Sequence, residues 1–394
     1  MILAFILLLS FLLNITDGLQ QPPKVMVVLL VRNKAHLLEN TLRLLEAQDY
    51  PKDRIGLYIR SDHNEDNSEE ILNDWLEAQN EYHFIDVKMG ANAGELFVDQ
   101  RSPLEWSPSR FQHMIELKEE ALNKGREVWA DWIWYLDVDA FMTNPQTLRL
   151  MVKDSSKTVI APMLTSVGLY SNFWAGMSDT YYYQRTEDYK PILERKTQDC
   201  HSVPMVHSSF FVNLNSKESS FLTFDPKLIE DYDGPIDDII TFALSATFND
   251  IDLFICNDNV YGYIMLPLDE NQDLNQDLDN LSNLKIEMFA YGQDLPIEDP
   301  VNTDLQTLGS DKVYLVNLDR RPDRLKNMKS IFNELKIDFT KIPAVDGKVD
   351  ITQEYIEKYG IKMMEDFSEP YHKRPLTLGE ILIPEDVKKQ CQGY

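Results

Sequence analysis

The sequence predicts an α/β fold: a sheet of buried, parallel strands covered by helices, followed by a second and incomplete α/β region. From residue 24 to about 268, hydrophobic strand-like runs alternate with amphipathic segments. Near residue 311 the pattern starts again, with another hydrophobic strand that runs into an Asn and then an Arg. A length of 394 residues with 43% hydrophobic side chains is sufficient for two or three domains with their own cores.

Residues 1–18 have the pattern of a secretory signal peptide. An apolar stretch runs from Ile2 to Leu13, and polar and small residues follow as far as Gly18. This stretch is shorter than the roughly 20 apolar residues that span a bilayer, and no later stretch is longer, so we expect no membrane span. The pattern therefore predicts a protein that enters a lumen or is secreted.

Charge and cysteine content narrow the partners and the compartment. The 65 acidic residues outnumber the 38 basic ones, and a net charge of -27 would repel a nucleic acid, which is therefore a poor partner. Of three cysteines, Cys200 and Cys256 can pair and would leave Cys391 over, but buried free thiols fit equally well. Asn280 begins a glycosylation sequon in a polar run, where we expect it to be accessible.

The strands and helices of the first region can be placed in order. The β-branched run "KVMVVLLVRN" from Lys24 suits a strand buried on both faces. A helix is expected to start after Ser107, an N-cap residue, with Pro108 in its first turn, and to end at Gly125. Residues 127–136, "EVWADWIWYL", then return through the sheet as a strand.

Two carboxylates follow that returning strand, at Asp137 and Asp139. On an extended chain they would point the same way, while Val138 packs on the other face. Like charges held together favour a cation between them, and oxygen ligands suit manganese or magnesium. Such a pair alone is more often part of a solvated turn. Ligand crevices of open α/β sheets lie at the carboxyl ends of strands, however, and this position favours a metal site.

The rest of the chain is expected to form a linker and the start of a second domain. Residues 269–310 are acidic, rich in Asn, Gln and Pro and weakly periodic, as a linker is. In residues 311–394, Val313–Leu318 is predicted to be a strand and Arg321–Leu335 a helix.

Several blocks in the same order resemble the procollagen galactosyltransferases of glycosyltransferase family 25. They are "YLDVDAFMTNPQTL", "VPMVHSSFFVNL", "DDIITFALSATFNDIDLFICNDNVYGY", "VNLDRRPDRLKNM", "AVDGK" and "PYHKRPLTLGE". The resemblance implies a GT-A-like nucleotide-sugar-binding domain at 24–268 and a second glycosyltransferase domain that starts at 311. It also implies transfer of galactose from UDP-galactose to hydroxylysine of collagen or procollagen chains in the endoplasmic reticulum lumen. The family continues beyond "LTLGE", so we expect the second domain to be truncated and a retention signal to be missing.

The resemblance also assigns roles. Asp137 and Asp139 would hold manganese against the diphosphate of the donor. His207 would be a third ligand, although a lone histidine after an apolar run is more often a core residue. An inverting transfer needs a carboxylate base, for which Asp237 and Asp238 are available; capping of the following helix is an equal alternative. We prefer Asp238.

Donor contacts are expected from residues at other strand ends. Arg32 and Asn33 end the first strand and Asp62 ends the next, where uracil and ribose would lie, although solvation in a surface loop is the more common role of such an Asp. Arg110 would reach a phosphate or be an ordinary surface arginine. Trp174 would stack on a sugar, but core packing is the more common role of a tryptophan.

Two other functions remain open from the sequence. One is a lumenal or secreted binding or adhesion protein that keeps the glycosyltransferase fold without turnover. The other is a metal-dependent phosphodiesterase, which explains the acids but not the surrounding blocks. The sequence also leaves open the oligomeric state.

Overall fold

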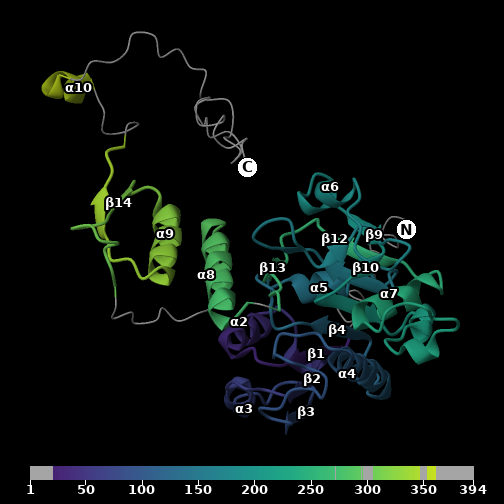
Figure 1. Ribbon diagram of the computed structural model, residues 1–394. Coiled ribbons are helices and arrows are strands. Elements are labelled where there is room, and N and C mark those ends of the chain that lie inside the picture. Colours follow the sequence, from purple (N-terminus) through teal and green to yellow (C-terminus); the bar gives the residue numbers. More distant parts are fainter. Residues whose placement is uncertain (1–20, 271, 294, 296–304, 347–352, 361–394) are drawn as a thin grey trace, which may run out of the picture. The chain divides into compact units, whose positions relative to one another are not determined.

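The computed structural model describes residues 21–270, 272–293, 295, 305–346 and 353–360. The described residues fall into two compact units, one made from Met1–Val313 with Asp323–Thr340 and the other from Tyr314–Pro322 with Lys341–Tyr394 (Figure 1). The expected signal peptide, Cys391 and the whole of "PYHKRPLTLGE" lie outside the described residues.

A central sheet of eight strands organises the first unit, in the order β3-β2-β1-β4-β11-β6-β12-β9. Strands β3, β2, β1 and β4 run parallel. Strand β11 is antiparallel to both of its neighbours, and β9 is antiparallel to β12, so the expected parallel sheet is in fact mixed. The strands are β1 Val25–Val31, β2 Ile55–Asp62, β3 Phe84–Ala91, β4 Trp132–Leu136, β6 Val159–Pro162, β9 Cys200–Val203, β11 Ser209–Asn213 and β12 Leu253–Cys256.

Helices and short strands complete this unit. The helices are α2 Ala35–Glu46, α3 Ser68–Glu77, α4 Pro108–Glu127, α5 Thr147–Met151, α6 Tyr189–Leu193, α7 Asp238–Thr247 and α8 Leu274–Ala290. The short strands are β5 Ala140–Phe141, β7 Leu164–Thr165, β8 Phe173–Trp174, β10 Met205–Val206 and β13 Gly262–Ile264. Short 3-10 turns occupy Lys52–Arg54, Lys217–Phe221 and Pro226–Leu228.

Both faces of the sheet are buried, as the apolar run of β1 predicts. Val27 and Leu29 point into a core that includes residues of α2, α3, α5 and α8. Met26 and Val28, which alternate with them, point into a second core with residues of α4, α6 and α7. The alternation follows from the period of two along a strand, and it places α4 and α7 on the same side of β4.

Helix α4 begins where the sequence predicts and ends slightly later. The Ser107 hydroxyl accepts the Arg110 amide at 3.4 Å, and Pro108 occupies the first turn. Gly125 does not end the helix, which continues to Glu127. A Cβ at Gly125 would lie 2.4 Å from Ile133 Cδ1, so the glycine instead allows α4 to pack closely against β4.

The acidic segment after β13 is not a simple linker, because α8 occupies Leu274–Ala290. Asp273 caps this helix by accepting the Gln276 amide, and Leu281, Leu284 and Met288 are buried in the first core. The many acids of the segment hide this apolar stripe. The sequon residue Asn280 therefore lies half-buried within a helix, and its expected accessibility is corrected.

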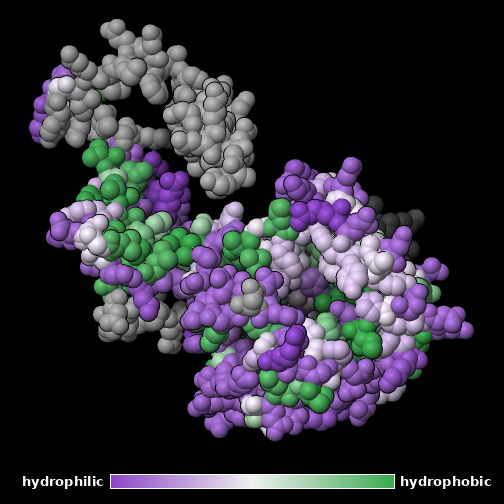
Figure 2. Space-filling view, viewed as in Figure 1, coloured by the Kyte–Doolittle hydropathy of each residue, from purple (hydrophilic) through white to green (hydrophobic). Residues whose placement is uncertain are grey.

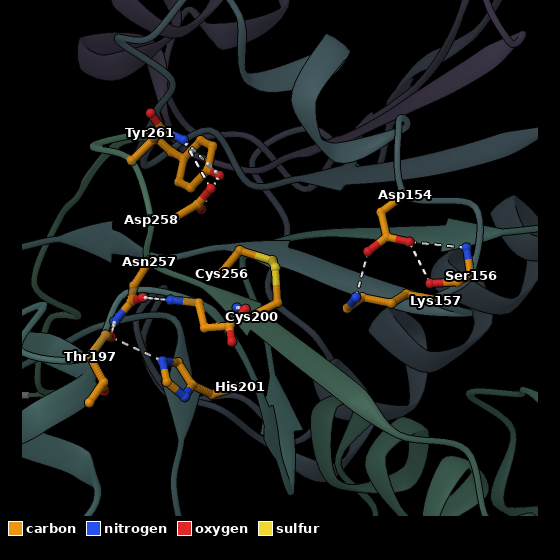
Figure 3. The surroundings of a disulfide bond; sticks show 12 residues. Asp154, Ser156, Lys157, Thr197, Cys200, His201, Cys256, Asn257, Asp258 and Tyr261 are labelled. Carbon is orange, nitrogen blue, oxygen red and sulfur yellow. Dashed lines mark hydrogen bonds and ion pairs between the residues drawn. A yellow bond between two sulfur atoms is a disulfide. The ribbon is translucent and has the colours of Figure 1, made fainter.

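A disulfide joins Cys200 to Cys256, which confirms that pairing. The two cysteines lie directly opposite each other on the antiparallel strands β9 and β12. Figure 3 shows Asn257 beside the bridge, where its side-chain amide donates to the Thr197 carbonyl at 2.8 Å. The bridge and this amide together hold the edge strand β9 onto the sheet.

The visible face of the first unit is mostly hydrophilic, with scattered apolar patches (Figure 2). Such a surface agrees with the acidic composition. Among the described residues, none of the helices combines the length and the apolar character that crossing a membrane requires.

The start of the second region also forms as predicted. Strand β14 spans Tyr314–Asn317, helix α9 spans Pro322–Glu334, and β14 pairs with β15, Thr340–Pro343. A last helix, α10, spans Gln353–Tyr359.

Candidate active site

The predicted acids lie in a turn directly after β4. The Ala140 amide donates to the Asp137 carbonyl at 3.1 Å, so the chain bends here instead of continuing as the extended strand that the sequence analysis assumed. Val138 is buried in the core, as expected. The carboxylates of Asp137 and Asp139 remain close enough for the charge of one to act on the other. We call Asp137, Asp139, Asp237 and Asp238 the acid cluster.

Asp137 is the most deeply buried acid of the turn. Its backbone amide donates to the Ser208 carbonyl at 2.7 Å, which ties the turn to the start of β11. Burial raises the pKa of Asp137 to about 6, and Asp139 adds to the rise, while the ammonium of Lys118 opposes it. A cation bound nearby would stabilise the ionised form of this carboxylate.

Asp139 has one oxygen that no group of the described residues satisfies. Its Oδ2 lies 3.5 Å from Lys34 Nζ, but its Oδ1 is buried and accepts no hydrogen bond. Its carbonyl accepts the Met265 amide at 3.0 Å, which fixes the backbone. A buried acceptor without a donor is costly, so Oδ1 is a ready ligand atom for a metal ion.

Asp237 and Asp238 have different partners. Asp237 caps α7, because its Oδ1 accepts the amides of Ile239 at 2.9 Å and Ile240 at 3.0 Å. Burial raises the pKa of Asp237, and the charge of Asp238 raises it further. The Asp238 side chain instead accepts a hydrogen bond from the buried ammonium of Lys118. Capping therefore accounts for Asp237 and not for Asp238.

His207 lies between β10 and β11, next to Ser208. It is buried, and burial lowers its pKa to about 4, helped by the charge of Lys118. Its Nδ1 lies 3.0 Å from the Ser208 hydroxyl. A histidine in this state is neutral at physiological pH and keeps a lone pair for a metal ion.

A basic pocket lies beside the acid cluster, at the carboxyl ends of β1 and β2. Lys34, two residues beyond Arg32, reaches Asp139 and connects the two sites. Arg32, Asp62 and Arg110, which the sequence predicted as donor contacts, all line a cavity of about 50 Å³. The other side chains that line it are Leu30, Val31, Arg60, Phe97, His113, Met114 and Leu117.

The two predicted arginines of the basic pocket are held by carbonyl groups and aromatic rings. Arg32 donates to the His63 carbonyl and to Gln100, but its Nη1 is buried without an acceptor. Arg110 donates to two carbonyls and lies 3.9 Å from the ring centre of Trp106. Burial, together with the nearby charge of Arg32, lowers the pKa of Arg110 to about 10. An anion placed between Arg32 and Arg110 would offset both the burial of their charges and the repulsion between them.

Asp62 accepts hydrogen bonds from two imidazoles, His63 Nδ1 at 2.7 Å and His113 Nε2 at 2.8 Å. These bonds lower the pKa of Asp62 despite burial, which acts to raise it. Asn92 Nδ2 lies 3.2 Å from His63 Nε2, and an amide NH2 only donates, so the proton of His63 is on Nδ1. In the part of the chain that the structure describes, these three residues are also the only group of three metal-type ligands within 4.8 Å of one another.

Two predicted residues lie outside the pocket lining. Asn33 accepts the Glu65 amide at 2.7 Å and its own amide donates to Asn64, so it fastens two loops together. Trp174 packs against the second core, with its ring 5.6 Å from that of Tyr183.

Sequence reasoning missed Lys118, His113, Lys34 and Arg60. His113 could have been predicted from the sequence, because it follows Arg110 by about one helical turn and so lies on the same face of the helix. Lys118 shares the buried face of α4 with Ile115 and Leu122, and a lysine in an apolar stripe is itself a signal. Lys34 and Arg60 carry no comparable local signal.

Two family models match the chain. Residues 22–285 match the glycosyltransferase family 25 N-terminal domain, and residues 310–382 match glycosyltransferase family 25 (LPS biosynthesis protein). A glycosyltransferase 25 family member of Aedes aegypti is 41% identical over 385 residues, which are 95% of this chain and 63% of that protein. Procollagen galactosyltransferase 2 of Mus musculus is 42% identical over 368 residues, 92% of this chain and 58% of that protein.

Solved structures resemble the chain in general outline. A mannosyltransferase from Pyrobaculum calidifontis in complex with GDP-Man and Mn²⁺ has 16% identity and a TM-score of 0.36, with 83% of this chain and 80% of that chain covered. The curated relatives are longer than this chain, which covers 58% of the mouse protein and 63% of the Aedes one. The expected α/β fold is confirmed by the central sheet and its helices, and the chain belongs to glycosyltransferase family 25.

Proposed function

We propose that the protein transfers galactose from UDP-galactose to hydroxylysine side chains of collagen or procollagen, with manganese as its cofactor, in the endoplasmic reticulum lumen. The proposal is supported by the family and by relatives named procollagen galactosyltransferases, which are 41–42% identical in Xenopus laevis, Mus musculus and Homo sapiens. A disulfide also suits an oxidising compartment.

The observation that carries the proposal is the ion pair between Asp139 of the acid cluster and Lys34, which lies two residues beyond Arg32 of the basic pocket. A nucleotide sugar has an anionic diphosphate between a base with ribose and a sugar. The pocket offers Arg32 and Arg110 to anionic or polar groups, and the cluster beside it offers oxygen ligands to a cation that would bridge to the diphosphate. The two sites meet through Lys34 and Asp139.

Asp137, Asp139 and His207 are residues of the type that binds a divalent ion, but among the described residues they are not within 4.8 Å of one another, so a bound ion would have to draw them together. Asp139 Oδ1 is buried without a donor from the described residues, Asp137 is a half-buried carboxylate with a raised pKa, and His207 is a buried, neutral imidazole. Oxygen ligands with one nitrogen suit manganese. When bound, such an ion supplies positive charge that stabilises the UDP leaving group.

Asp238 is the base in this mechanism. The hydroxyl oxygen of hydroxylysine attacks C1 of galactose on the face opposite the diphosphate, and its proton passes to the Asp238 carboxylate. The bond between C1 and the phosphate oxygen breaks, and UDP leaves with that electron pair. The configuration at C1 is thereby inverted. Asp237 is assigned to the helix cap in this mechanism, because its Oδ1 accepts two amides of α7.

A donor screen tests the proposal. The full chain is incubated with UDP-sugars and a hydroxylysine-containing collagen-like peptide, with and without Mn²⁺. Mass spectrometry of the peptide then detects the mass added by a transferred sugar. Calorimetry with UDP runs in parallel. We expect transfer of galactose that requires Mn²⁺. UDP binding without transfer would favour the binding-protein alternative, and no UDP binding in Mn²⁺ would refute the proposal.

A further inference from the structure

Lys118 is a lysine on the buried face of helix α4. Its relative exposure is 6%, and the buried residues around it on the same helix are Ile115, Ala121 and Leu122. An ammonium is almost never buried so deeply unless an anion pairs with it. The identity of that anion therefore indicates the role of Lys118.

The partner of Lys118 belongs to the acid cluster. Its Nζ donates to Asp238 Oδ2, and the two side chains are 7% and 4% exposed. The field of the same ammonium reaches Asp137 and Asp237. Lys118 is thus a buried cation that acts on three of the four carboxylates, whereas the other lysine at the cluster, Lys34, pairs with Asp139 from a half-exposed position.

The backbone of α4 is fixed at this point relative to the acids. The Tyr135 hydroxyl donates to the Lys118 carbonyl at 2.9 Å. Tyr135 belongs to β4 and precedes Asp137 by two residues. Helix α4 also packs against α7, which begins at Asp238. The ammonium therefore has a set position between the strand that leads to the metal ligands and the helix that bears the base.

We propose that Lys118 is the positioning residue of the acid cluster, which keeps Asp238 ionised and oriented as the base and leaves Asp137 and Asp139 to bind the cation. This inference rests on the proposed function. Without Lys118, the buried Asp238 would have no cation beside it and would take up a proton. A protonated carboxyl cannot accept the proton of the acceptor hydroxyl, so turnover would fall while the metal ligands stayed in place.

A purely structural role for Lys118 predicts a different result. Loss of packing between α4 and α7 would disturb the turn after β4 as well, and Mn²⁺ binding, UDP binding and turnover would decline together. If Lys118 is a positioning residue, turnover falls while Mn²⁺ binding and UDP binding stay the same, because only the protonation of Asp238 changes. The separation can be measured with three variants of the full chain, Lys118→Met, Lys118→Arg and the control Lys124→Met.

We expect Lys118→Met to lower kcat by about 100-fold or more, the lower range for the loss of a general base, with the KM for UDP-galactose and the Kd for Mn²⁺ within about threefold of wild type. Lys118→Arg keeps the charge and should recover at least about tenfold of the lost kcat. Lys124, on the same helix, pairs with Asp86 and Glu127, and Lys124→Met should change none of these values. A Lys118→Met kcat within about threefold of wild type, or a parallel loss of Mn²⁺ affinity, would overturn the inference.

Isotope-edited infrared spectroscopy keeps this test separate from the proposed function. In protein with ¹³C-labelled aspartate, the Asp238 band is identified by its absence in Asp238→Asn. We expect an ionised carboxylate at neutral pH in wild type and a protonated carboxyl in Lys118→Met. If wild type transfers no galactose, the proposed function fails, and an Asp238 that stays ionised in Lys118→Met then overturns the role of Lys118.

A neutral pair keeps the test decisive if Lys118→Met does not fold. The double variant Lys118→Met with Asp238→Asn removes both buried charges, so neither is left unpaired. We expect it to fold, to bind Mn²⁺ within about threefold of wild type and to lack turnover. Weaker Mn²⁺ binding by this folded variant would show that Lys118 supports the metal ligands and not the base, which contradicts the inference.

Discussion

The basic pocket and the acid cluster differ in the charge of the polar groups that have no partner. In the pocket, Asp62 accepts two imidazoles and Arg110 donates to two carbonyls. In the cluster, Asp139 Oδ1 is buried without a donor from the described residues, and Asp137 is a half-buried carboxylate with a raised pKa. The buried atoms of the pocket that have no partner among these residues are instead two donors, Arg32 Nη1 and Arg60 Nε. The pocket therefore lacks an anion, whereas the cluster lacks a cation.

This difference has an energetic meaning. A buried charge without compensation costs free energy, and a cation that supplies the missing charge recovers that cost on binding. Affinity for a metal ion should therefore depend mainly on the cluster, and affinity for the nucleotide mainly on the pocket. Four predictions test this division.

The largest effect is expected from Asp139→Asn, which keeps the shape of the side chain and removes its charge. The cluster then loses the negative charge of a carboxylate whose Oδ1 has no partner among the described residues. We therefore expect Mn²⁺-dependent UDP binding to fall by about 100-fold or more, since each tenfold step in affinity is only about 1.4 kcal/mol. Calorimetry with and without Mn²⁺ measures it. The control Asp154→Asn removes an acid that is paired with Lys157. Unchanged UDP affinity in Mn²⁺ would contradict the metal site.

Asp237 and Asp238 should separate stability from turnover. Asp237→Ala removes the cap of α7 and should lower the free energy of unfolding by about 1 kcal/mol, with the KM for the donor unchanged. Asp238→Asn should lower kcat by about 100-fold or more and leave UDP binding intact. Denaturant unfolding and steady-state kinetics on both variants show which acid is the helix cap and which is the base. If Asp237→Ala folds and it alone abolishes turnover, Asp237 is the base and Asp238 is not.

His207 should make the cluster region sensitive to acid. Its pKa is about 4 in the folded protein and about 6.5 in an unfolded chain. Between these values the unfolded state binds the extra proton, so the free energy of unfolding falls as pH drops from 6.5 to 4, by at most about 1.4 kcal/mol per pH unit. His207→Gln should lack this part of the slope. Denaturant unfolding of wild type and His207→Gln, without metal and at several pH values, measures how the free energy of unfolding changes with pH. Equal slopes for the two proteins would show that His207 is not buried as a neutral side chain.

Much of the fold was predictable because its signals are local. The apolar run of β1, the Ser107–Pro108 start of α4 and the acids that follow β4 are all read from neighbouring residues. The mixed direction of the sheet was not predictable in this way, because the direction of β11 depends on pairing with β4, far away in the sequence. Helix α8 was missed because its apolar stripe is sparse among acids and gains its stability from packing on the core.

The candidate site divides in the same way. The sequence indicated Asp137, Asp139, Asp237 and Asp238, but could not tell a cap from a base. That distinction came from the partners, two amides of α7 for Asp237 and the ammonium of Lys118 for Asp238. The partner of Asp238 lies 120 residues away, on a different helix. Only the packing of α4 against α7 brings the pair together.

The smallest effect is expected in the basic pocket, from Arg32→Lys. Arg32 Nη1 is buried and has no acceptor among the described residues, while the rest of its guanidinium is held by His63 and Gln100. Lysine keeps the charge but lacks the planar fork that binds an anion with two parallel hydrogen bonds. We therefore expect UDP to bind about tenfold more weakly, roughly 1.4 kcal/mol.

Mn²⁺ titration distinguishes this effect from damage to the acid cluster. If the pocket acts on the nucleotide alone, the Arg32→Lys variant and wild type should bind Mn²⁺ equally well, and the ratio of their UDP affinities should not change with Mn²⁺ concentration. Arg149→Lys is the matched control, because Arg149 is half-exposed on α5 and donates to Asp49 away from the pocket lining. A loss of Mn²⁺ affinity in Arg32→Lys would mean that the charges of the two sites act as one unit, and the division between a nucleotide pocket and a metal cluster would then be wrong.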